Sequence, residues 1–81
     1  MGTKNKPGKF DCYGNAEPDE PMFILLARDM TAPELVELWA HRREQLIQCG
    51  AKPESDRPMI EEARQCAATM RLWRRDNRPP R

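Results

Sequence analysis

The chain has 81 residues, of which 38% are hydrophobic and 33% charged, and its formal net charge is +1. This length, below the usual domain size of about 100 to 150 residues, excludes a second domain, and so polar a composition predicts a small core. The near-zero net charge disfavours nonspecific binding to nucleic acids, and no apolar run approaches the roughly 18 residues needed to span a bilayer.

An N-terminal arm, residues 1–21, is rich in glycine, proline and charge. We expect residues 1–9 to be disordered because they contain almost no apolar side chain that can be buried. Phe10 and Tyr13 differ, since two aromatic rings this close together in a polar arm usually lie against an apolar surface. That surface belongs either to residues 10–81, which we predict to be a single small helical domain, or to a partner.

A short apolar segment, about residues 20–28, follows the arm. Its apolar run, residues 22–27, fits a short strand or a buried helix, since periodicity does not separate the two over so few residues. The preceding Asp19-Glu20-Pro21 is a helix-start signal, and a lone strand would find no partner in this chain unless a second molecule supplied one. We therefore expect a helix here, with a strand as the alternative.

The clearest local signal predicts a helix over about residues 31–49. Thr31 and Glu34 match a capping box, and Pro33 falls in the first turn, where its missing N–H is harmless. Gly50 supplies the left-handed residue that ends a helix. Between these limits the apolar residues recur with helical spacing at Leu35, Val36, Leu38, Trp39, Leu46 and Ile47.

A second long helix is predicted over about residues 56–77, with Ser55 or Asp56 as its cap. Its apolar residues recur in steps of four and three, the spacing of a coiled-coil seam, at Met59, Ala63, Cys66, Met70 and Trp73. Joined by a short connection, the two helices predict an all-α fold built on an antiparallel helical hairpin. So thin a core makes self-association a reasonable expectation.

No group of residues matches a catalytic, cofactor or metal motif, so we expect a protein that is not an enzyme and uses no cofactor or metal. The single serine and the single histidine, Ser55 and His41, fall at a helix cap and on a helix surface. The three cysteines, Cys12, Cys49 and Cys66, contain no close pair, whereas zinc sites and disulfide frameworks usually do. Without a secretory signal or a membrane span, the chain is expected in the cytoplasm.

Two charged surfaces remain as candidate binding sites. Arginines crowd the end of the chain around Trp73, where they can hold an acidic protein, grip nucleic acid or complement the dipole of the second helix. The acidic arm with its two aromatic rings can contact a basic groove or pair with the protein's own arginines. The predicted partner-binding residues are Phe10, Tyr13, Asp19, Glu20, Arg71, Arg74, Arg75 and Arg78.

Several stretches of the sequence resemble a group of small uncharacterised proteins encoded by tailed phages and prophages. These stretches are Phe10-Asp11-Cys12-Tyr13, residues 18–29 (PDEPMFILLARD), and Ala32-Pro33-Glu34-Leu35-Val36 with Trp39-Ala40, within a likeness that spans about residues 10–77. The resemblance carries no known activity, cofactor or set of functional residues. It implies an accessory protein that acts in the cytoplasm of a bacterial host.

Together these features predict a non-enzymatic interaction module that binds a host protein and modulates or inhibits it. One alternative is nucleic-acid binding through the arginine-rich C-terminal helix, which the overall charge balance disfavours. The other alternative is a self-assembling structural or small-ligand-binding helical protein, in which homo-oligomers form along the seam from Met59 to Trp73. None of the three requires a membrane.

Overall fold

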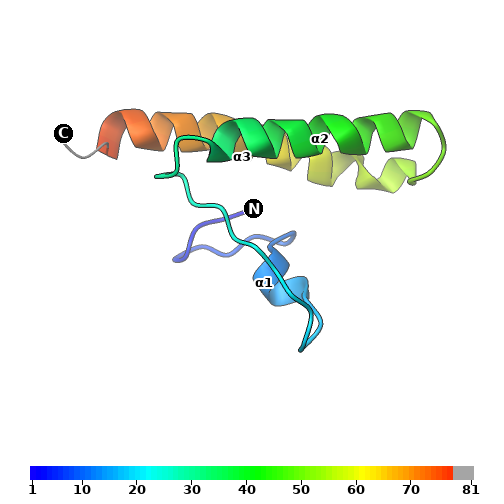
Figure 1. Cartoon of the computed structure of the whole chain (residues 1–81), viewed down its shortest axis with the longest axis horizontal. Helices are drawn as coiled ribbons and strands as arrows, with labels where there is room; N and C mark the ends of the chain where they lie inside the picture. Colours follow the sequence, from blue (N-terminus) through cyan, green and yellow to red (C-terminus); the bar gives the residue numbers. More distant parts are fainter. Residues whose placement is uncertain (78–81) are drawn as a thin grey trace.

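The computed structural model of the chain describes residues 1–77. Its helices are, in chain order, α1 (Cys12–Asn15), α2 (Ala32–Gln48), the 3₁₀ turn η1 (Glu54–Asp56) and α3 (Arg57–Asn77). Residues 1–77 contain no strand, so the prediction of a helical fold is confirmed for them. Figure 1 shows α2 and α3 lying side by side, while the N-terminal arm with α1 projects from one side of this pair.

The two long helices begin and end within one residue of the predicted limits, 31–49 and 56–77, but the expected capping box is absent from the start of α2. Thr31 has helical backbone angles, φ −88° and ψ −12°, and its side chain makes no capping bond. Its hydroxyl and its backbone N–H instead both donate to the carboxylate of Asp29, at 2.7 and 2.9 Å. A residue already in the helical conformation does not aim its hydroxyl at the next turn, so Asp29 closes the turn before α2.

α2 ends where the sequence predicts. Gly50 has φ +84°, in the left-handed region that glycine adopts without strain. Its N–H donates to the C=O of Ile47, and the N–H of Ala51 donates to the C=O of Leu46, at 3.0 and 2.8 Å. These two bonds form a Schellman motif, which satisfies carbonyl groups that the helix end leaves free. The chain then turns through residues 51–56 into α3.

α2 and α3 can approach closely because their facing residues are mostly small. Ion pairs flank the contact, with Glu44 and Arg64 joined at 3.0 Å and Glu37 and Arg71 at 2.6 Å. The earlier residue on α2 pairs with the later residue on α3, so the two helices run in opposite directions. Ile60 is the largest fully buried side chain of the core. The buried hydrophobic residues are Ala32, Ala40, Ile47, Ile60, Ala63 and Ala67.

The predicted seam of α3 coincides only partly with its buried face. Ala63 is buried as expected, but the other buried positions are Ile60 and Ala67, which lie beside the seam. Periodicity shows that α3 has an apolar side, but it does not show which of two adjacent stripes meets α2. The remaining seam residues are half-buried or, for the last of them, 45% exposed: Met59, Cys66, Met70 and Trp73.

Residues 20–28 form neither the expected helix nor the alternative strand. Residues 21–26 have no regular secondary structure, and the trace in Figure 1 runs from the tip of the arm toward α2 without a helical ribbon. Turns close both ends, through bonds from the N–H of Glu20 to the C=O of Glu17 and from the N–H of Asp29 to the C=O of Leu26. So short an apolar run sustains a helix only when tertiary contacts cover it, and most of its side chains are exposed.

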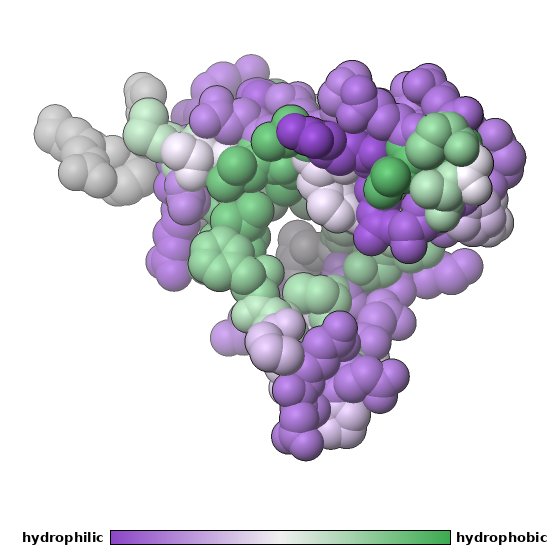
Figure 2. All heavy atoms as spheres, turned by 45° about the vertical axis from the view of Figure 1, so that its right-hand side comes forward, coloured by the Kyte–Doolittle hydropathy of each residue, from purple (hydrophilic) through white to green (hydrophobic). Residues whose placement is uncertain are grey.

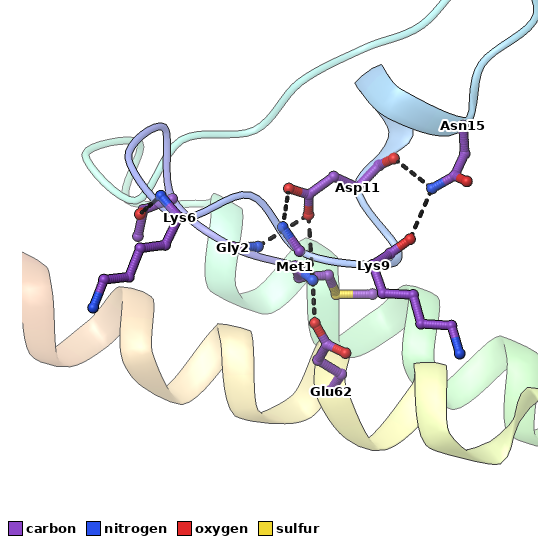
Figure 3. A network of polar contacts seen from close by, with 9 residues as sticks. Met1, Gly2, Lys6, Lys9, Asp11, Asn15 and Glu62 are labelled. Atoms are coloured by element: carbon purple, nitrogen blue, oxygen red, sulfur yellow. Dashed lines mark hydrogen bonds and ion pairs between the residues drawn. The ribbon is translucent and has the colours of Figure 1, made fainter.

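The first residues of the arm return to the helix pair, as Figure 3 shows. Met1 packs against the buried cluster between α2 and α3, and its amino group pairs with the carboxylates of Glu62 and Asp11. Asp11 also accepts the N–H groups of Gly2 and Gly8, at 2.9 and 2.7 Å. A side chain at Gly8 would collide with the backbone of this same loop. The structure thus gives residues 1–9 a defined path, and their disorder in solution stays a prediction.

Candidate functional site

The structure gathers the predicted arginines of α3 at one end of the helix pair. They line a cleft of about 360 Å³, which we call the basic cleft, formed by Met30, Pro33, Glu34, Arg71, Arg74 and Arg75. These residues come from the last turns of α3, the first turn of α2 and the turn that precedes α2. Guanidinium groups are therefore placed beside apolar methionine and proline side chains.

Arg71 links α3 to α2. Its two terminal nitrogens donate to the two carboxylate oxygens of Glu37, at 2.6 and 2.8 Å. The hydrogen bonds lower the pKa of Glu37 and raise the pKa of Arg71, so both groups are charged at neutral pH. Because this bidentate pair already engages the guanidinium, we assign Arg71 mainly to holding the two helices together.

Arg74 and Arg75 are engaged less fully than Arg71. Arg74 donates to the backbone C=O of Arg28, which holds the chain before α2 against α3. Arg75 bonds through Nε to the neighbouring Asp76 at 3.2 Å, and both of these side chains are largely exposed. Within residues 1–77, neither guanidinium forms an ion pair with another helix. Both can therefore receive an acidic group from another molecule.

A carboxylate also lies near Arg74. Hydrogen bonds from the side chain and the backbone of Thr31 lower the pKa of Asp29, and the positive charge of Arg74 lowers it further. Asp29 is therefore ionised at neutral pH. A negative charge on Asp29 thus stands close enough to Arg74 for the two to interact.

The predicted arm residues lie apart from the basic cleft, and none of them lines it. Phe10 is half-buried beneath the ammonium group of Lys9, whereas Tyr13 is 78% exposed. Asp19 and Glu20 are exposed near the tip of the arm. A second hollow, of about 380 Å³, is lined there by Cys12, Asn15, Ala16, Glu20, Pro21, Met22 and Phe23. The partner-binding residues predicted from the sequence thus belong to two separate surfaces. One of them, Arg78, lies outside the described part of the chain.

Sequence reasoning missed the extent of the exposed apolar surface. Figure 2 shows hydrophobic residues in a band that continues from the helix pair down the arm. The signal was present in the helix from Ala32 to Gln48, whose apolar positions occupy a wider stripe than one partner helix can cover. The large exposed side chains are Tyr13, Met22, Phe23, Ile24, Leu26, Met30, Leu35, Leu38, Leu46, Leu72 and Trp73.

The cysteines occupy different environments. Cys12 and Cys49 are exposed, while Cys66 is half-buried on α3. Burial raises the pKa of the Cys66 thiol, so it stays protonated and weakly nucleophilic at neutral pH. In residues 1–77, no three His, Cys, Asp or Glu side chains are grouped closely enough to hold a metal ion.

Over the same residues, no helix combines the length and the apolar character that crossing a membrane requires. Comparison with family models, with curated proteins and with solved structures finds no match to this chain.

Proposed function

We propose that this protein is a non-enzymatic accessory protein, of the kind that tailed phages and prophages encode, which binds a protein of its bacterial host and modulates or inhibits it. In this proposal the protein acts in the host cytoplasm. The antiparallel hairpin of α2 and α3 is the scaffold, and the basic cleft is the contact site. The resemblance over residues 10–77 supports the phage context, and the geometry of the cleft supports the binding role.

The observation that carries the proposal is the composition of the basic cleft. Its arginines stand beside the apolar side chains of Met30 and Pro33, and Trp73 is exposed on the same turns of α3. Arginine and aromatic side chains contribute much of the binding energy in protein interfaces, especially where apolar surface surrounds them. A partner segment with a carboxylate next to an apolar side chain would satisfy both parts of the cleft.

The carboxylates around the cleft favour a protein over a nucleic acid as the partner. Glu34 lines the cleft, Glu37 is paired with Arg71, and Asp76 lies beside Arg75. A continuous phosphate backbone would pass these negative charges at an energetic cost. A protein segment presents acidic groups at only a few positions, so it can meet the arginines and avoid the carboxylates.

The test is capture of the partner with a variant altered only in the cleft. Tagged wild-type protein and the Arg74→Ala/Arg75→Ala variant are incubated with nuclease-treated bacterial lysate at low and moderate salt, and retained proteins are identified by mass spectrometry. We expect one host protein to bind the wild type. Its affinity for the variant, measured by titration with the purified partner, should be at least about tenfold lower.

The matched control is Arg42→Ala/Lys52→Ala, which removes the same charge at exposed positions outside the cleft and should retain the partner. Undiminished binding by the folded cleft variant would contradict the proposal. A cleft variant that melts far below the wild type would show that the two arginines are structural. Binding only to nucleic acid, with an affinity that falls steeply as salt rises, would support the alternative function.

A further inference from the structure

Residues 22–26, which we call the apolar segment, expose most of their large hydrophobic side chains to solvent. Phe23 is 83% exposed, more than any other large hydrophobic residue described, and Ile24 is 54% exposed. Leu25 and Ala27 are half-buried between exposed neighbours. Met22, Phe23 and Ile24 are thus three consecutive exposed apolar residues, which the rest of the described chain leaves largely uncovered.

The backbone of the apolar segment is unpaired as well. Within the described chain, the N–H and C=O groups of residues 22–25 take part in no hydrogen bond, and turns at residues 17–20 and 26–29 bound the segment. The same part of the chain contains no strand that could pair with it. An apolar stretch of backbone with free donors and acceptors can pair with another chain as a sheet edge does.

We infer that the apolar segment pairs with the same segment of a second copy, as an antiparallel ribbon centred on Ile24. The charged residues on either side of the segment favour a second copy of the chain as its partner. Glu20 precedes Ile24 by the same number of residues as Arg28 follows it. In a two-fold antiparallel pair, the turns at the two ends of the ribbon therefore bring Glu20 of each copy near Arg28 of the other, and both side chains are exposed in the single chain.

The same register also matches the apolar side chains. Met22 faces Leu26 of the second copy and Ile24 faces its own counterpart, so the exposed side chains of both copies join in one apolar face. On the other face, Phe23 lies next to Leu25 of the second copy. Phe23, the most exposed side chain of the segment, thus gains apolar surface from the second molecule.

Pro21 determines which residues exchange hydrogen bonds. In antiparallel strands, pairs that exchange both backbone bonds alternate with pairs that exchange none. Pro21 has no N–H and must fall in a pair that exchanges none, so the bonds fall on Ile24 and on the Met22–Leu26 pairs. The Leu26 carbonyl keeps its bond from Asp29, because a carbonyl oxygen has two lone pairs.

This inference goes beyond the proposed function, because the apolar segment lies outside the basic cleft. Its test needs no host protein, so it can fail or succeed independently. The molecular mass of the full chain is measured by sedimentation equilibrium over a range of concentrations. We expect an equilibrium between monomer and dimer, and a wild-type protein that stays monomeric throughout would overturn the inference.

A variant at the two-fold axis tests the surface. Ile24→Asp places two carboxylates next to each other at the centre of the ribbon and should shift the protein to monomer. Leu38→Asp, an equal change at an exposed position of α2, should leave the dimer intact. Circular dichroism of both variants establishes that their helices are retained. A dimer that tolerates Ile24→Asp would show that another surface holds the copies together.

Exchange of the flanking charges tests the register. Glu20→Arg and Arg28→Glu each place like charges opposite one another, and each should weaken dimerisation several-fold. The double variant restores opposite charges and should restore the dimer. Glu20 also accepts the N–H of Glu17, at 2.9 Å, but a purely local effect of its loss would not be rescued by Arg28→Glu. Failure of that rescue would overturn the register and with it the inference.

Discussion

At the scale of single residues, Asp11 organises a segment that has almost no regular structure. Its carboxylate accepts the N–H groups of Gly8 and Gly2 and pairs with the amino group of Met1. The hydrogen bonds from Gly8 and Gly2 lower the pKa of Asp11. Because the folded-state pKa lies below the unfolded value, the contribution of Asp11 is complete at neutral pH and disappears as the pH falls through the lowered pKa.

Asp11→Asn should therefore release the start of the arm from the helices. The amide keeps the size of the side chain but removes the charge that holds Met1 and weakens acceptance of the two N–H groups. The NMR signal of the Met1 methyl group, which packs against the buried cluster, should move toward its random-coil position, while the helical circular dichroism is retained.

Acidification provides the matching test for Asp11. In the wild type, the Met1 signal should move in the same direction once the pH falls below the ordinary carboxyl pKa of 3.8. The Asp11→Asn variant should lack the part of this change that Asp11 causes. A Met1 signal that is the same in both proteins at neutral pH would show that Glu62 alone holds the N-terminus.

At the scale of secondary-structure elements, the contact between α2 and α3 depends on few large side chains. Most of its buried residues are alanines, which allow close approach but remove little apolar surface from water. Ile47 and Ile60 are the only branched aliphatic residues among the buried positions described. The stability of the helix pair is therefore concentrated at these two positions.

Ile60→Ala should lower the free energy of unfolding by about 2 to 5 kcal/mol, because it removes a fully buried side chain and leaves a cavity. Leu72→Ala, on the exposed side of the same helix, should change it by less than about 0.5 kcal/mol. Urea unfolding followed by circular dichroism measures both values. Equal losses in the two variants would mean that the buried face of α3 is assigned wrongly.

At the scale of the whole molecule, stability is distributed unevenly. α2 and α3 contain the buried residues, whereas α1 contains none and the arm reaches the helix pair chiefly through Met1 and through the bond from Arg74 to Arg28. Segments with few buried contacts open at a lower free energy than the core. The molecule is therefore a helix pair with a weakly held appendage.

Hydrogen exchange measured by mass spectrometry should reveal this gradient. At low protein concentration, the amides in the middle of α2 and α3 should exchange most slowly, and those of α1 and residues 22–26 should exchange fastest. Equal protection of α1 and α3 would contradict this view of the molecule. If protection of the amides of residues 22–26 from exchange increases with protein concentration, the proposed ribbon between two copies forms.

The parts of the fold that could be predicted from sequence are those set by neighbouring residues. Gly50, and the prolines at the starts of both long helices, fix the helix limits locally. The buried face of α3 and the shape of residues 20–28 could not be predicted, because both depend on contacts between residues far apart in the chain, such as those of α2 with α3 and that of Arg74 with Arg28.

The residues of the candidate site likewise include some that the sequence could predict and some that it could not. The sequence identified Arg71, Arg74 and Arg75, because arginines crowd one end of a predicted helix. It did not identify Met30 and Pro33 as their neighbours in the basic cleft, since only the packing of α2 against α3 brings them together.

The contact between Met1 and Glu62 also has a consequence for biosynthesis. Met1 leaves the ribosome well before Glu62 and Ile60, which belong to α3, so this contact closes only after that part of α3 has been made. Until then α2 lacks its partner helix, and the apolar segment stands next to it in the growing chain. Nascent chains on neighbouring ribosomes of one message can therefore meet through this segment first, so that two copies associate before either has completed its own fold.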